Sequence, residues 1–397
     1  MTAGDGRSSG ALSIALIGTR GVPAHYGGFE TAVEEVGARL ADRGHAVRVY
    51  CRSGNSDAPL ASFRGMTLVT LPAARRRSLE TLTHTGLSVA HLAARRTDVA
   101  IVFNAANAVW LPVVRAARIP VATHVDGLEW KRAKWGPNGV RYYRWAERRS
   151  VRLSDALIAD ARGIADYYAD EFDAPTTVIS YGAPQIDEVG SGRLDELGLA
   201  ADGYHLVVAR FEPENHVAEI VAGYVRSAAR RPLVVVGSAP YAEQYVARIR
   251  AIADTDPRVR LLGGIWDQEL LDQLYRGATT YLHGHSVGGT NPSLLRALGG
   301  SAATIAFDIG FNREVLGDAG TYFRDEHDVA RLVEDAESDP VALAERRAGA
   351  RARAGAYDWD AVTDGYEQLA RDLHARTTPG PRRRADRRRL REAVAVP

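Results

Sequence analysis

The sequence predicts an α/β protein made of two doubly wound, Rossmann-like domains in tandem. Short apolar runs alternate with helical patterns along most of the 397 residues. This alternation is typical of parallel sheets that helices cover on both faces. The alternation extends through the first half of the chain, is interrupted by a polar stretch and resumes in the second half. The length also exceeds what one hydrophobic core usually organises, so two domains are expected.

Each half contains several apolar runs of the length expected for buried strands. In the first half the strands are expected at residues 11–18, 46–51, 66–72, 98–104, 119–125, 156–160 and 176–184. In the second half they are expected at residues 204–211, 231–238, 259–265, 279–285 and 302–308. Apolar residues at helical spacing follow the first of these runs, at Phe29, Val33, Val36 and Leu40, and end before Gly44.

Changes in composition set the expected domain boundaries. Residues 12–184 form the N-terminal domain, and the polar stretch 185–203 is a linker to the C-terminal domain at 204–356. Residues 357–375 are predicted to form a C-terminal helix. A polar N-terminus (1–11) and a basic tail (376–397) are expected to be disordered because neither has enough apolar residues to pack.

Composition excludes several classes of protein. Fifty Lys and Arg residues balance 49 Asp and Glu residues, leaving a formal charge of +1, so no overall basic field favours nucleic acid. The single cysteine, Cys51, excludes an internal disulfide framework and fits a reducing compartment. With neither a signal peptide nor a bilayer-spanning apolar run in the sequence, a soluble cytoplasmic protein is expected.

The glycine-rich loop after the first strand does not fit a dinucleotide site. It has glycine at positions 18, 21, 27 and 28 rather than the G-x-G-x-x-G pattern, and the second strand ends in Arg52 rather than an acidic residue. NAD is therefore disfavoured, and NADP has only Arg52 in its favour. Gly27 and Gly28 precede a helix, where bare amides can approach an anion or a sugar oxygen. A turn that needs glycine for geometry alone explains them equally well.

A second glycine-rich segment, residues 283–300, leads from a strand into a helix at about Pro292. Thr290, Asn291 and Ser293 surround the start of this helix, where the helix dipole favours a diphosphate. Ordinary capping by Asn291 is the alternative, although Gly288 and Gly289 favour close approach of a ligand. His283 and His285 have an H-x-H spacing without an evident third ligand, so no metal site is expected.

Five segments together resemble a known family. They are IALIGTRGVPAHYGGFET, THVDGLEWKRAKW, VVARFEPENH, VGGTNPSLL and FDIGFNREVLGDAGTYF, in that order. Over residues 12–374 the chain is similar to the retaining GT-B glycosyltransferases of family 4, and within them to the bacterial branch associated with rhamnosyl transfer to lipid-linked polysaccharide precursors. The resemblance implies two Rossmann-like domains that face a cleft, with the nucleotide-sugar mainly on the C-terminal domain and the acceptor mainly on the N-terminal one.

The resemblance implies a set of donor-binding residues. Arg210 matches the arginine that grips the diphosphate, and His216 stands where a lysine often follows. The full implied set is Gly27, Gly28, Arg210, His216, Gly237, Ile265, Gly289, Thr290, Asn291, Pro292, Ser293, Leu294 and Arg296. Gly288 and Arg296 occupy the places of two glutamates, the second of which binds ribose hydroxyls in many members. Because a guanidinium cannot accept a hydrogen bond, Arg296 favours a deoxyribose donor such as dTDP-rhamnose and also raises the hypothesis of a weakened enzyme.

On the acceptor side, Asp126 is the first candidate to position the acceptor hydroxyl and His124 the second. Capping of a turn before Gly127 is the alternative for Asp126. The implied acceptor-binding residues are Glu30, Trp130, Lys131 and Lys134, the last two being the only lysines in the chain. Tryptophans and cations suit a sugar diphosphate, but a solvated amphipathic helix would show the same pattern.

The resulting hypothesis is transfer of L-rhamnose from dTDP-rhamnose, with retention, to a lipid-linked or polysaccharide-precursor acceptor. In this class the leaving diphosphate takes the acceptor proton, so no carboxylate nucleophile, cofactor or divalent metal is expected, and Arg210 neutralises developing charge. Eight arginines from Arg376 to Arg391 fit contact with the inner face of the plasma membrane, or a solubilising end. The alternatives are a GT-B enzyme with another nucleotide-sugar, an epimerase of similar fold, and a non-catalytic binding protein.

Overall fold

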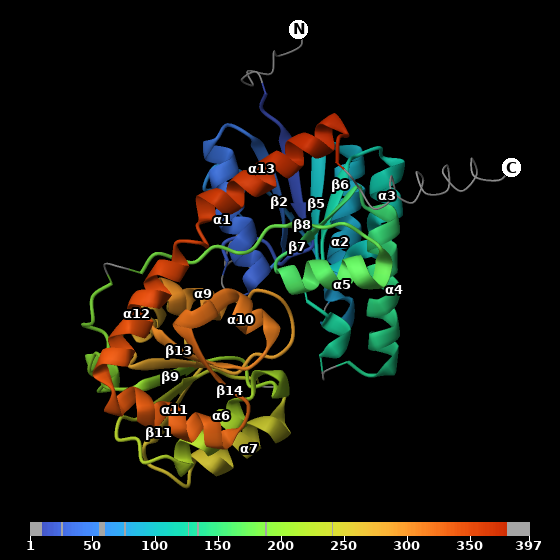
Figure 1. Cartoon of the computed structure of the whole chain (residues 1–397). Helices are drawn as coiled ribbons and strands as arrows, with labels where there is room; N and C mark the ends of the chain where they lie inside the picture. The colour runs from blue at the N-terminus through green and yellow to red at the C-terminus, as the bar shows by residue number, and fades with distance from the viewer. Residues whose placement is uncertain are drawn as a thin grey trace, which may run out of the picture. The chain divides into compact units, whose positions relative to one another are not determined.

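The computed structural model describes residues 10–24, 27–54, 60–74, 77–125, 127–132, 135–186, 189–239 and 241–378. It confirms the predicted α/β class with two predominantly parallel sheets (Figure 1). Contacts divide the chain into an N-terminal unit, to which Met1–Ser180 and Trp359–Pro397 are assigned, and a C-terminal unit, Tyr181–Asp358. Residues 185–186 and 189–203 therefore belong to the C-terminal unit, and the last helix belongs to the N-terminal unit.

The N-terminal unit contains an eight-stranded sheet in the order β3-β4-β2-β1-β5-β6-β7-β8, in which all neighbours are parallel except β3 and β4. Its central strands are almost fully buried, because helices cover both faces. The strands are Ser13–Ile17 (β1), Ala46–Arg52 (β2), Ser62–Phe63 (β3), Met66–Leu71 (β4), Val99–Phe103 (β5), Val121–His124 (β6), Ala156–Ala159 (β7) and Thr177–Val178 (β8).

Six α-helices belong to the described residues of this unit. They are Gly28–Asp42 (α1), Arg77–Ala94 (α2), Leu111–Ala116 (α3), Pro137–Leu153 (α4), Arg162–Phe172 (α5) and Trp359–Ala375 (α13). Short 3-10 turns lie at Ala105–Trp110 (η1) and Glu129–Lys131 (η2). Val33, Val36 and Leu40 of α1 are buried, as their spacing predicts. Helix α13 packs on α1 although more than 300 residues separate them, and Arg39 pairs with Asp360 across this contact.

The C-terminal unit contains a six-stranded parallel sheet in the order β11-β10-β9-β12-β13-β14. Its strands are His205–Val208 (β9), Leu233–Val236 (β10), Val259–Gly263 (β11), Thr280–His283 (β12), Ala303–Phe307 (β13) and Gly320–Phe323 (β14). Its helices are Val217–Arg226 (α6), Glu243–Ala253 (α7), Gln268–Gly277 (α8), Pro292–Gly299 (α9), Gly310–Leu316 (α10), Glu326–Ser338 (α11) and Pro340–Ala354 (α12). The 3-10 turns are Asp195–Leu197 (η3), Pro213–Asn215 (η4) and Gly317–Ala319 (η5).

The strand order of the C-terminal sheet reverses between β9 and β12. The chain moves outward from β9 through β10 to β11, then returns to place β12 on the other side of β9. In open parallel sheets, ligands bind beyond the carboxyl ends of the strands at such a reversal. The loops that leave β9 and β12 contain Arg210 and Thr290, so the topology brings two predicted donor-binding segments to one edge.

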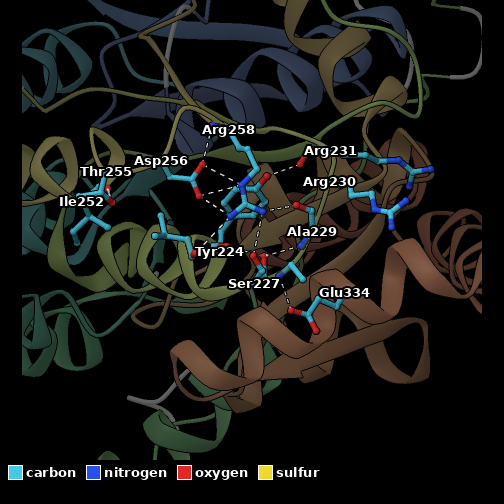
Figure 2. Close-up of polar contacts among 12 residues, drawn as sticks. Tyr224, Ser227, Ala229, Arg230, Arg231, Ile252, Thr255, Asp256, Arg258 and Glu334 are labelled. Carbon is cyan, nitrogen blue, oxygen red and sulfur yellow. Dashed lines mark hydrogen bonds and ion pairs between the residues drawn. The ribbon is translucent and has the colours of Figure 1, made fainter.

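A polar cluster around Arg258 lies where β11 begins, at the end of the sheet opposite the carboxyl ends of the strands, and stabilises that end (Figure 2). The guanidinium pairs with Asp256 at 2.6 Å and lies 5.0 Å from the ring centroid of Tyr224. It also donates to the carbonyl of Ser227 at 3.1 Å and to that of Ala229. Arg258 thereby fixes the loop between α6 and β10, so this cluster has a structural role.

None of the helices in the described part of the chain is long and apolar enough to cross a bilayer.

Candidate functional site

Side-chain and backbone hydrogen bonds join the loops that leave β9 and β12. The amide of Asn215 donates to the carbonyl of Arg210 at 2.8 Å, and its Oδ1 atom lies 2.7 Å from Nδ1 of His285. The amide of Ser286 donates to the carbonyl of Glu214 at 2.9 Å. Asn215 is buried, so these bonds are shielded from water. The two loops therefore form one rigid structure at the strand reversal.

Two glycines permit close backbone approach at this edge. A Cβ atom on Gly284 would lie 2.1 Å from the carbonyl oxygen of Asn215, and one on Gly237 would lie 1.8 Å from that of Ala209. Gly237 follows β10, and its amide donates to the carbonyl of Gly263 at 2.8 Å. A side chain at either position would separate the loops, so glycine is required there by packing alone.

Arg210 is held by a buried carboxylate. Its side chain is about one-third exposed, and Nη2 lies 3.5 Å from Oε2 of Glu212, whose side chain is 3% exposed. The hydroxyl of Tyr241, from the loop after β10, donates to Oε1 of Glu212 at 2.5 Å. Tyr241 therefore orients Glu212, and Glu212 orients a partly exposed guanidinium at the strand reversal.

His216 is also fixed in position. Its Nδ1 atom lies 2.8 Å from the carbonyl oxygen of Gly284, so this nitrogen carries the proton. Its ring stacks on Phe307 with a centroid distance of 4.1 Å and an interplanar angle of 13°. In the neutral imidazole, Nε2 is then an acceptor, and it donates to a phosphate only after a second protonation.

Asn291 caps the start of α9, which is one of the two interpretations that the sequence allows. Oδ1 of Asn291 accepts from the amide of Ser293 at 2.9 Å, while its backbone carbonyl accepts from Leu294. Leu294 is fully buried and Thr290 nearly so, which places both in the packing of the unit. Asn291 thus has a structural partner, and the positive end of the α9 dipole lies beside the preceding glycines, Gly288 and Gly289. Pro292 is the first residue of this helix.

Arg296 is engaged with α8. Its Nε donates to Asp272 at 2.6 Å and its Nη1 donates to Gln268 at 2.6 Å. The charge that departs from the family pattern is therefore balanced by a neighbouring carboxylate. This arrangement accounts physically for an arginine at a position where the resemblance implies a glutamate.

His283 is the last residue of β12 and directly precedes one of these loops. It is fully buried at the end of β12, and burial lowers its pKa to about 3, so it is neutral. The Tyr281 hydroxyl lies 3.1 Å from its Nδ1. Its ring centroid is 6.2 Å from that of His285. Among the residues that the structure describes, no group of three His, Cys, Asp or Glu side chains is arranged to hold a metal ion.

Two exposed aromatic residues near this edge were missed by sequence reasoning. Trp266 follows the half-buried Ile265 and is 61% exposed, and Tyr241 is 47% exposed. Both lie in loops that leave neighbouring strands, β10 and β11. In the sequence, these two residues could have been recognised as aromatic residues that shortly follow a strand ending at glycine.

In the N-terminal unit, Glu30 connects the glycine-rich loop to α1. Its Oε1 atom accepts from the amide of Arg20 at 2.9 Å, and a Cβ atom on Gly27 would lie 2.2 Å from its Oε2 atom. Gly27 has φ of 113° and precedes Gly28, the first residue of α1. The predicted acceptor-binding carboxylate of Glu30 therefore has a partner within its own unit, and Gly27 is required by both conformation and space.

His124 is a core residue. It is the last residue of β6 and fully buried, with its ring stacked on Phe103 at 5.5 Å and edge-on to Phe29 at 5.2 Å. Burial lowers its pKa to about 3, so it carries no charge near neutral pH. Asp126, the first catalytic candidate, lies outside the described residues.

Trp130 packs against α4. The guanidinium of Arg144 lies 4.2 Å from its ring centroid, and Nζ of the exposed Lys131 lies 5.4 Å from it. Such spacing is that of cation–π contacts. Lys134, the other predicted acceptor-binding lysine, lies outside the described residues.

Beside this loop, α4 buries a carboxyl group that sequence reasoning missed. Glu147 is 3% exposed and accepts from the hydroxyl of Tyr167 at 3.1 Å. Burial raises its pKa to about 7. Glu147 is the only acidic residue of α4, which also contains five arginines. This isolated carboxyl group was the sign in the sequence that the position is unusual.

Residues 27–182 match the family described as "Glycosyl transferase 4-like domain". No curated protein matches the sequence. Solved structures with a similar fold include sucrose-phosphate synthase from Thermosynechococcus elongatus, which is 20% identical with a TM-score of 0.77 over 91% of this chain and 99% of that one.

HepE of Anabaena, solved in complex with UDP-glucose, is 16% identical with a TM-score of 0.72 over 90% of this chain and 99% of that one. The UDP-forming α,α-trehalose-phosphate synthase from Burkholderia vietnamiensis is 13% identical, with a TM-score of 0.67 over 91% and 100%. Similarity at these identities shows the fold. The match over residues 27–182 is therefore to a glycosyl transferase 4-like domain, and the chain as a whole has the GT-B fold.

Proposed function

We propose that this protein is a retaining glycosyltransferase that moves L-rhamnose from dTDP-rhamnose to a lipid-linked or polysaccharide-precursor acceptor. The observation that carries the proposal is that Arg210 and the start of α9 follow the two adjacent strands at the strand reversal of the C-terminal sheet. It occurs in a chain whose N-terminal half matches a glycosyltransferase domain.

The diphosphate of the donor would bind at this reversal. A guanidinium that a buried carboxylate orients suits phosphate oxygens, because its planar fork needs little reorganisation. The dipole of α9 adds positive potential, and Gly288 and Gly289 leave its first turn open to close approach. Tyr241 and Trp266, with Gly237 and Ile265, would flank the nucleoside.

The deoxyribose preference is supported by Arg296. Its guanidinium, which donates to Asp272 and Gln268, has no acceptor atom, so it cannot accept from a ribose 2′-hydroxyl. A dTDP donor has no such hydroxyl. The resemblance adds that Gly288 replaces the first expected glutamate in rhamnosyl-type relatives as well.

In the proposed mechanism, the leaving diphosphate accepts the proton of the incoming hydroxyl on the same face of the sugar. The role of the protein is to hold both groups and to neutralise charge that develops on the diphosphate. Arg210 supplies that charge, and His216 supplies a donor when it is doubly protonated. Asp126 stays the candidate for positioning the acceptor, because His124 is sealed in the core.

The test is turnover with defined donors. Purified protein is incubated with dTDP-L-rhamnose, UDP-glucose or GDP-mannose and a polyprenyl-diphosphate glycan, and release of nucleoside diphosphate and the anomeric configuration of the product are measured. Release from dTDP-rhamnose with retention supports the proposal. Preference for UDP-glucose, the ligand seen in HepE, would establish another donor. Tight binding without turnover would indicate a non-catalytic protein.

A further inference from the structure

Helices α2, α3 and α4 form one layer of the N-terminal unit, with α3 in contact with both of the others (Figure 1). The outer side of α4 is a single row of exposed residues at helical spacing. After the first turn of the helix they are Arg141, Trp145, Arg148, Arg149 and Arg152. In the part of the chain that the structure describes, none of these arginines has an acidic partner, and the only carboxyl group of α4, on Glu147, is buried.

The neighbouring helices add uncharged side chains. Leu79 and Leu87 of α2 are each 44% exposed, and Val113 of α3 is 39% exposed. Together with Trp145, at 38%, they are four of the nine large apolar residues exposed in the described chain. The one carboxylate of α2, on Glu80, pairs with Arg52. We call this set of residues the α2–α4 surface: Leu79, Leu87, Val113, Arg141, Trp145, Arg148, Arg149 and Arg152.

Trp145 and Arg149 show how such a surface is built. The guanidinium of Arg149 lies 5.1 Å from the ring centroid of Trp145, one helical turn away. Tryptophan prefers the boundary between water and hydrocarbon, and arginine pairs with phosphate oxygens just above that boundary. Aliphatic side chains beside them would enter the acyl region.

We propose that the α2–α4 surface binds the face of an anionic phospholipid bilayer. Four arginines without carboxylates complement anionic headgroups, and the apolar residues of the same helical layer would have no partner on a nucleic-acid backbone. The inference deepens the proposed function, since a lipid-linked acceptor lies at such a membrane. It assigns membrane contact to a folded helical layer rather than to the arginine-rich tail.

The test uses the full chain and vesicles made of equal parts of phosphatidylcholine and phosphatidylglycerol. The variant R141Q/R148Q/R149Q/R152Q is expected to lose at least tenfold in vesicle affinity in flotation. The matched control R226Q/R248Q/R324Q/R331Q removes the same charge from exposed arginines of the C-terminal unit and is expected to keep its affinity. Loss with the first and not the second supports the proposal; equal affinities overturn it.

A second readout is independent of affinity. Phospholipid with brominated acyl chains is expected to quench the fluorescence of Trp145, so W145F loses most of the quenching while W266F retains it. The reverse result overturns the proposal. The proposal is also overturned if R141Q/R148Q/R149Q/R152Q weakens binding to duplex DNA but not binding to vesicles. Release of nucleoside diphosphate with a water-soluble acceptor is measured in parallel, so failure of the membrane inference is distinguished from failure of the proposed activity.

Discussion

The carboxylate of Glu212 lies 3.5 Å from the guanidinium of Arg210 and accepts a hydrogen bond from Tyr241 on its other oxygen. Because Glu212 is nearly fully buried, its position is fixed by the fold, and the position of Arg210 follows from it. The orientation of the proposed diphosphate-binding group is thus set by Tyr241 and by Glu212, which need not itself touch the ligand.

Substitutions along this chain of contacts are expected to weaken donor binding in graded fashion. Arg210→Ala removes the charge, and we expect a loss of about 100-fold or more in dTDP affinity by calorimetry. Glu212→Gln keeps the volume but releases the guanidinium, so a smaller loss of about 5- to 10-fold is expected. Arg226→Ala, on the exposed side of α6, is the control. Unchanged affinity of the Arg210 variant would place the diphosphate elsewhere.

Gly237 is expected to tolerate no side chain. In Gly237→Ala the new Cβ would collide with the carbonyl of Ala209, and relief of the collision would shift the loop after β10 at a cost of about 1–3 kcal/mol. Urea unfolding of the full chain measures this. Gly192→Ala is the matched control, because nothing lies within 4 Å of the position of its Cβ. Equal stability of the two variants would contradict the packing argument.

Glu147 is expected to make stability depend on pH. Burial raises its pKa from 4.5 to about 7, so between these values the folded protein holds a proton that the unfolded chain has released. The free energy of unfolding therefore falls as pH rises through this window, by up to about 3 kcal/mol for this group.

Glu147→Gln should remove that component, so that the variant is more stable than the parent at pH 8 and similar to it at pH 4. Thermal melts across this pH range give the comparison. Glu345→Gln, an exposed position on α12, is the control. If the Glu147 variant keeps the pH dependence of the parent, the buried carboxyl group is not its source.

Arg258 is expected to matter for stability and not for ligand binding (Figure 2). Arg258→Met removes the guanidinium that donates to Asp256 and to the carbonyls of Ser227 and Ala229, which should cost about 2 kcal/mol. Arg258→Lys should recover part of the loss through Asp256. Affinity for dTDP should be unchanged in the folded fraction, because the cluster lies at the edge opposite the strand reversal. A large loss of affinity would contradict this separation.

The repeating apolar runs were enough to predict both parallel sheets, since a strand buried on both faces requires a continuous apolar sequence. The capping segment around Asn291 also indicated correctly where α9 begins. The environment of His124 could not be predicted in this way. Whether a polar residue ends a strand inside the sheet or just beyond it depends on neighbouring rings, here those of Phe103 and Phe29.

Long-range partners were equally hidden. The sequence shows Arg296 as a departure from a family pattern, but its balance by Asp272 comes from the packing of α8 on α9. Glu147 stood out only by its charge, and its burial depends on where α5 packs. Contacts between elements distant along the chain leave no periodic trace in the sequence.

Helix α13 has a consequence for the order in which the protein is assembled. The N-terminal unit needs this helix to cover α1, yet its residues are the last of the described units to be synthesised. The C-terminal unit is continuous in sequence and is complete when residue 358 leaves the ribosome. The N-terminal unit, most of which is synthesised first, therefore completes its fold after the C-terminal unit.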